Sequence, residues 1–122
     1  MTVFGVAIAG ALGALARYGL GGYIASRFPS AFPWETFVIN ISGSFVIGLL
    51  FVLFTEKLMP HPALRTALMV GFVGAYTTFS TFSLETFRLI EDGALVLAAA
   101  VLASVVAGLL AVYIGVVIAR AI

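Results

Sequence analysis

Four apolar runs, each long enough to cross a lipid bilayer as a helix, occupy almost the whole chain. They lie at about residues 3–24, 36–54, 63–89 and 94–119, and a membrane-spanning helix needs roughly 20 apolar residues. Only 9% of the residues are charged, whereas soluble domains carry about 25%. The sequence therefore predicts an all-α membrane protein that forms one four-helix transmembrane domain over residues 1–122, surrounded by the lipid bilayer.

The composition also excludes several classes of protein. The chain has no cysteine, so disulfides, thiolate metal sites and cysteine nucleophiles are excluded. The formal net charge of +1 is too small for a basic surface that binds nucleic acid. The serine, histidine and carboxylate residues form no recognisable catalytic arrangement. We therefore expect neither an enzyme nor a nucleic-acid partner.

The third apolar run contains an unusually polar stretch, VGFVGAYTTFSTFS, at residues 70–83. It holds five serine and threonine side chains, and its glycines and threonines are weak helix formers. We therefore expect the third helix to break between about Gly74 and Thr78 and then to resume. Broken helices at membrane depth line cavities or lie buried in protein, and they often build ion sites. The alternative is that the hydroxyls bond to the preceding turn and only pack helices.

The second apolar run carries polar side chains on one helical face. Thr36, Asn40 and Ser44 are spaced by four residues, which places them on the same face. The carboxamide of Asn40 is costly in hydrocarbon unless it finds hydrogen-bond partners. It either makes an interhelical hydrogen bond or serves as a donor that lines a pore. Ser104, the only hydroxyl in the centre of the fourth run, is weak evidence by itself.

Charged residues are rare inside the runs. Arg17 lies within the first run, where it either reaches back to the interface or faces a wet vestibule that attracts anions. Glu85 and Arg88, near the end of the third run, are spaced to pair at i, i+3.

Three strings resemble the small bacterial fluoride channels of the Fluc or CrcB family, and the resemblance covers the whole chain. They are GALGALARY (10–18), FVINISGSFVIG (37–48) and GFVGAYTTFSTFS (71–83). The resemblance implies a fluoride-selective channel of the inner cell membrane that exports cytoplasmic fluoride passively and so gives fluoride resistance. It also implies a dual-topology homodimer of two antiparallel subunits with two pores. The chain departs from the family at 75–76, where glycine is frequent, and at Ala100, where some members have tyrosine.

The resemblance also implies which residues line the pore. In the family, the pore is lined by an asparagine of the second span, two phenylalanines of the TTFSTF string and a serine of the fourth span. Fluoride must exchange its water for hydrogen-bond donors, and the positive edge of a phenyl ring can face an anion. Together with the polar face of the second run, the predicted path consists of Thr36, Asn40, Ser44, Phe79, Phe82 and Ser104, with Arg17 in the vestibule.

One structural Na⁺ per dimer, not transported, is a further implication of the resemblance. Its ligands are backbone carbonyls at the helix break, at positions that match Gly74 and Thr77. A broken helix leaves carbonyl groups without their i+4 partners, and a two-fold axis through the break would double their number. Four carbonyl oxygens suit a monovalent ion better than Mg²⁺, which prefers octahedral coordination.

The distribution of basic residues agrees with dual topology. If both termini share one side, the basic residues number three on that side and two on the other, so the positive-inside rule selects no orientation. These residues are Lys57, Arg65 and Arg120 on the first side and Arg27 and Arg88 on the second.

Two other functions remain as alternatives. A small four-span multidrug exporter of dual topology needs a carboxylate in its first span, where this chain has Arg17. A non-transporting packing subunit would need only small residues that let helices approach closely, such as Ala111 and Gly115. That second alternative leaves the hydroxyl-rich stretch of the third run unexplained.

Overall fold

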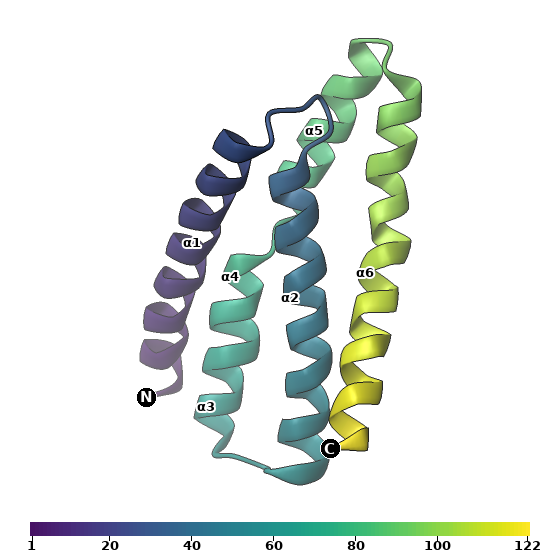
Figure 1. Ribbon diagram of the computed structural model, residues 1–122. Helices are drawn as coiled ribbons and strands as arrows, with labels where there is room; N and C mark the ends of the chain where they lie inside the picture. Colours follow the sequence, from purple (N-terminus) through teal and green to yellow (C-terminus); the bar gives the residue numbers. More distant parts are fainter.

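The computed structural model describes residues 1–122 and consists of helices joined by short connections (Figure 1). Four helical segments are long and apolar enough to cross a membrane, which confirms the all-α, four-span prediction. The first two spans comprise α1 (Thr2–Arg27) and then α2 (Trp34–Val52) with a π-helical turn, η1 (Leu53–Lys57). The third span comprises α3 (Pro62–Thr66), the π-helical segment η2 (Ala67–Val73), α4 (Gly74–Tyr76) and α5 (Phe79–Glu91). The fourth span is α6 (Leu95–Ala121).

The third span is interrupted at Thr77 and Thr78, which we call the break. Thr77 has φ −83° and ψ 159°, and Thr78 has φ −146° and ψ 121°, so both residues are extended. Gly74 is still helical, and the break therefore occupies the last part of the predicted range. The hydroxyl of Thr78 accepts a hydrogen bond from the N–H of Thr81 at 3.3 Å. Threonine favours extended backbone and is a good N-cap, so the sequence itself starts α5 here.

Close backbone contacts hold the spans together. In Figure 1, α2 lies between α6 and the first half of the third span. A Cβ atom on Gly115 of α6 would overlap with the carbonyl oxygen of Phe45 in α2, so only glycine allows this approach. A Cβ atom on Gly13 of α1 would likewise overlap with the carbonyl oxygen of Phe72 in η2. Gly13 in the first run and Gly115 in the fourth therefore allow these helices to pack closely.

Both chain termini lie at the same end of the bundle (Figure 1). At that end, Arg120 of α6 forms an ion pair with Glu56 of η1 at 2.7 Å. At the other end, the turn between α5 and α6 contains Gly93 with φ +73°, a value that favours glycine. Only 18 of the 122 residues are buried, so most apolar side chains of the bundle face outward, as lipid contact requires.

Candidate functional site beside the helix break

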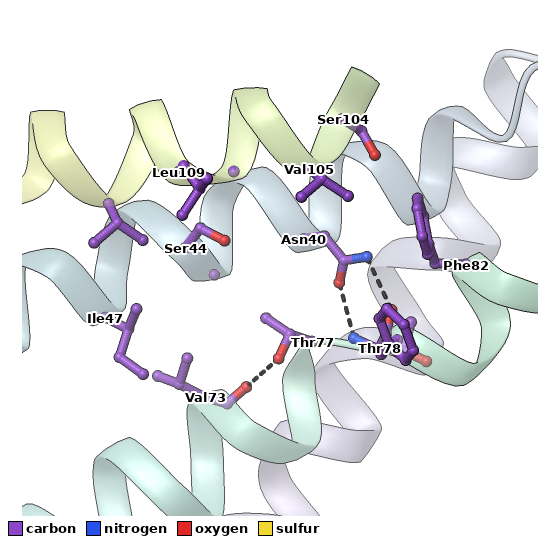
Figure 2. A pocket seen from close by; sticks show the side chains of 14 residues that line it. Asn40, Ser44, Ile47, Val73, Thr77, Thr78, Phe82, Ser104, Val105 and Leu109 are labelled. Atoms are coloured by element: carbon purple, nitrogen blue, oxygen red, sulfur yellow. Dashed lines mark hydrogen bonds between the residues drawn. The ribbon is translucent and has the colours of Figure 1, made fainter. Parts of the chain in front are cut away.

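An open groove of about 340 Å³ lies between α2, the break, α5 and α6. None of its 14 lining residues is charged. Figure 2 shows side chains from these elements pointing into it. The groove brings together five of the six predicted path residues and both residues of the break: Asn40, Ser44, Phe79, Phe82, Ser104, Thr77 and Thr78.

Asn40 connects α2 to the break through two hydrogen bonds (Figure 2). Its Oδ1 accepts from the N–H of Thr78 at 2.8 Å, and its Nδ2 donates to the carbonyl of Thr78 at 2.9 Å. An amide nitrogen has two hydrogens, so one N–H of Asn40 remains beside the groove. Asn40 therefore makes the interhelical hydrogen bond that was one of the two alternatives from the sequence, and it also lines the groove.

The hydroxyl groups in the groove differ in what they can offer a ligand. Thr77 donates to the carbonyl of Val73 at 3.1 Å, and Ser104 donates to the carbonyl of Val101. Ser44 lines the groove and makes no hydrogen bond to the protein. Besides the hydroxyl of Thr78, which accepts from the N–H of Thr81 and keeps its own hydrogen, the donors left for a ligand are the hydroxyl of Ser44 and the second N–H of Asn40.

The two phenylalanines of the TTFSTF string lie side by side on one face of α5. Their ring centroids are 5.8 Å apart with an interplanar angle of 33°. Phe82 is 8% exposed and forms a fixed wall of the groove, whereas Phe79 is 78% exposed at its open side. The rings therefore flank the groove at different depths.

A second cavity, of about 220 Å³, lies on the other side of the break and is more polar. Thr36 lines this cavity and not the groove. Ser44 lies eight residues after Thr36, a distance of about 12 Å along the helix, so the face that they share is longer than the groove. Thr78 lines both spaces, which meet at the break. The second cavity is lined by Arg17, Tyr18, Gly21, Glu35, Thr36, Ile39, Thr78, Thr81 and Glu85.

Arg17 is half-buried and turns toward the break. Its Nε donates to the carbonyl of Ala75 in α4 at 3.2 Å. A positive charge is favourable there, because the carbonyl end of a helix carries partial negative charge. The side chain also lines the second cavity.

Glu85 accepts a hydrogen bond from the hydroxyl of Thr36 at 2.7 Å through Oε1, while its Oε2 is buried without a partner. The predicted pairing of Glu85 with Arg88 is wrong, because the only salt bridge joins Arg120 to Glu56. The sequence reasoning missed Glu85 as a lining residue. The spacing of Thr78, Thr81 and Glu85, which places them on one helical face, could have indicated it.

The carbonyl groups of Gly74 and Thr77 have both lost their helical partners. In a continuous helix, the N–H of Thr78 would bond to Gly74 and that of Thr81 to Thr77. Here the N–H of Thr78 goes to Asn40, and that of Thr81 goes to the hydroxyl of Thr78. Gly74 is also exposed on the surface of the chain.

Comparison with known proteins places these features in a family. A family model described as CrcB-like protein, Camphor Resistance (CrcB), matches residues 4–116. A protein of Geotalea uraniireducens named fluoride-specific ion channel FluC is 48% identical over 121 residues, covering 98% of each chain. A protein with the same name from Citrifermentans bemidjiense is 49% identical over 117 residues, which cover 95% of this chain and 94% of the relative. Another, from Magnetococcus marinus, is 48% identical over 121 residues, which cover 98% of each chain. This chain belongs to the CrcB family.

Proposed function

We propose that this chain is a fluoride-selective ion channel through which cytoplasmic fluoride leaves the cell passively. The observation that carries the proposal is an uncharged groove in which two hydrogen-bond donors, from Ser44 and Asn40, have no protein partner. The names of the relatives, which are ion channels and not enzymes, support the same function.

The groove suits a small anion that must lose its water. Removing that water costs many kcal/mol unless donors replace it, and the amide of Asn40 and the hydroxyl of Ser44 are such donors. The edges of Phe79 and Phe82 add the positive part of an aromatic quadrupole. The groove holds no lysine or arginine, so binding stays weak enough for the ion to leave. Arg17 adds a positive charge beside the break, in the second cavity, whose lining also includes the carboxyl groups of Glu35 and Glu85.

The direction of transport follows from charge. Neutral HF enters through lipid and dissociates in the more alkaline cytoplasm, where the anion is trapped. The inside-negative membrane potential then drives fluoride outward with about 2.3 kcal/mol per 100 mV. A passive channel in the inner membrane therefore suffices for fluoride resistance.

The working form is a homodimer of two antiparallel subunits. One support is the groove itself, which is open on the side where Phe79 is 78% exposed. A second is the near balance of cations between the two ends of the bundle. Lys57, Arg65 and Arg120 belong to the end with the termini, and Arg27 and Arg88 to the other. Such a chain has no preferred orientation by the positive-inside rule, and two opposite copies pair about an axis in the membrane plane.

A structural Na⁺ fits the carbonyl groups at the break. The carbonyls of Gly74 and Thr77 lack their helical donors, and two antiparallel copies would present four such oxygens. Oxygen ligands without a carboxylate suit a monovalent cation better than Mg²⁺. When bound, the ion supplies a fixed positive charge that holds the two breaks together, and it is not transported.

The test is fluoride efflux from proteoliposomes, followed with a fluoride electrode. With a potassium ionophore to balance charge, vesicles that contain the protein should release fluoride rapidly, and protein-free vesicles should not. Chloride-loaded vesicles should release almost nothing, because the two donors and two ring edges compensate a small ion only. Equal release of chloride and fluoride would contradict the proposal.

A further inference from the structure

The last residue of α4, Tyr76, is joined to α2 by a hydrogen bond outside the groove. Its hydroxyl oxygen lies 2.9 Å from Oγ of Ser42, and Oγ of Ser42 also donates to the carbonyl of Ile39 at 3.1 Å. A serine hydroxyl has only one hydrogen. Both bonds can therefore form at once only when the hydroxyl of Tyr76 is the donor to Ser42. The result is a directed chain of hydrogen bonds from Tyr76 through Ser42 to Ile39.

The ring of Tyr76 is fixed as well. It stacks on the ring of Phe72, with centroids 6.2 Å apart and an interplanar angle of 11°. The ring also lies close to Gly43 of α2, where a Cβ atom would be 3.2 Å from Cδ1 of Tyr76. The contacts with Phe72 and Gly43 therefore restrict the ring of Tyr76 while its hydroxyl bonds to Ser42.

Three consecutive residues of the third span thus contact a short piece of α2. Tyr76 bonds to Ser42, and Thr78 bonds to Asn40. Between them, a Cβ atom on Gly43 would overlap with Cγ2 of Thr77. The extended break is attached on both sides, although neither Tyr76 nor Ser42 lines the groove.

We propose that Tyr76 is a positioning residue, which holds the end of α4 on α2 through Ser42 so that Thr78 stays in register with Asn40. The inference rests on the proposed function only for its effect on fluoride flux. Its effect on the hydrogen bond between Thr78 and Asn40 is independent of what the protein transports.

Because Tyr76 donates and Ser42 accepts, substitution of Ser42 and substitution of Tyr76 should have different effects. Ser42→Ala leaves the hydroxyl of Tyr76 without an acceptor, and an unsatisfied donor away from water is unfavourable. Tyr76→Phe removes the donor, while Ser42 keeps its bond to Ile39. In the double variant no group is left unsatisfied, and replacement of both partners by apolar groups can be nearly neutral. The double variant should therefore be less perturbed than Ser42→Ala alone.

The readout is hydrogen exchange of the Thr78 amide, measured by NMR on the full-length protein in lipid nanodiscs. Tyr76→Phe, which loses the bond to Ser42 without leaving a group unsatisfied, should raise this exchange rate above the wild-type rate, and Ser42→Ala should raise it further, about tenfold or more. The double variant should return most of the way to the rate of Tyr76→Phe. Ser26→Ala removes a comparable bond, from Ser26 to the carbonyl of Tyr23 at 2.8 Å, and should leave the rate unchanged. Tyr113→Phe, at an exposed tyrosine, is the second control.

Two results would overturn the proposal. One is wild-type exchange at Thr78 in Ser42→Ala, and the other is exchange in the double variant as fast as in Ser42→Ala. Fluoride efflux should be measured on the wild-type protein, Tyr76→Phe, Ser42→Ala and the double variant. It should fall as the exchange rate of the Thr78 amide rises. If the exchange rates follow this order and even the wild-type protein releases no fluoride, the positioning role stands and the proposed function fails.

Discussion

The side-chain amide of Asn40 takes both backbone polar groups of Thr78, with its Oδ1 2.8 Å from the nitrogen and its Nδ2 2.9 Å from the carbonyl oxygen. A neighbouring helix thereby replaces the intrahelical bonds that the extended residue cannot make. An unpaired backbone group away from water is unfavourable by roughly 1–3 kcal/mol. The break is therefore stable only while α2 presents an amide at this position.

Asn40→Asp should abolish most fluoride flux. The aspartate can still accept from the N–H of Thr78, but its second oxygen faces the carbonyl of Thr78, to which Asn40 donates. It also places a negative charge at the groove, where it repels an anion. We expect flux to fall about tenfold or more, the equivalent of the 1–3 kcal/mol of one lost buried partner. Efflux at verified incorporation measures this, and wild-type flux would remove Asn40 from the path.

Phe82→Ile should reduce flux while the protein still folds. The side chain of Phe82 is 8% exposed. Isoleucine fills a similar position but lacks the positive ring edge that can face an anion. Phe87→Ile is the matched control on the same helix, because Phe87 is 55% exposed and does not line the groove. If both variants conduct equally well, the ring of Phe82 has no part in permeation.

Gly43→Ala should destabilise the fold at the break. The new methyl group would overlap with Cγ2 of Thr77, and overpacking of this kind costs about 1–3 kcal/mol. Gly19→Ala is the control, since a Cβ atom there meets nothing within 4 Å and alanine improves helix propensity by about 0.5–1 kcal/mol. Thermal unfolding in detergent should give a lower midpoint for Gly43→Ala only. An unchanged midpoint for Gly43→Ala would show that Thr77 can move away from the new methyl group without loss of stability, and it would contradict the prediction.

Cysteine labelling should detect both orientations of the chain in the membrane. Ala31→Cys, in the exposed connection between α1 and α2, introduces the only thiol of a chain without cysteine. An impermeant reagent added outside intact cells should modify about half of the copies, because the cation balance gives no bias. Leu58→Cys, in the connection at the opposite end, should give a similar fraction. Complete labelling of one variant and none of the other would refute dual topology.

Exchange of Na⁺ for a large organic cation such as N-methyl-D-glucamine should weaken the dimer. Without the ion, carbonyl groups of Gly74 and Thr77 from two copies would face one another with no donor between them. We expect loss of fluoride flux and partial dissociation in detergent, both reversed when Na⁺ is restored. Full flux and an intact dimer after exhaustive exchange would contradict a structural Na⁺.

The spans could be predicted from the sequence because hydropathy and helix length are local properties. The break could be predicted for the same reason, since adjacent threonines after a glycine weaken a helix wherever they occur. Even so, Gly74 stays helical and the backbone extends only at Thr77 and Thr78. The π-helical geometry of η1 and η2 had no sequence signal that we could identify.

The partners of the polar side chains could not be predicted, because they depend on how helices meet. Glu85 has a suitable neighbour three residues on, yet it bonds to Thr36, 49 positions away. Arg17 finds its acceptor on Ala75, 58 positions away. Asn40 was recognisable as a site residue because an amide in an apolar run needs partners, but nothing local indicated that Thr78 supplies both.

Thr78 belongs to the walls of the groove and of the second cavity at once. A continuous helix at that place would separate the two spaces by its full diameter, about 10 Å. Here the extended backbone of Thr78, bonded to Asn40 of α2, is a wall that the two spaces share. In the proposed path, fluoride therefore passes beside a single residue from the second cavity into the groove, where the donors of Asn40 and Ser44 replace its water.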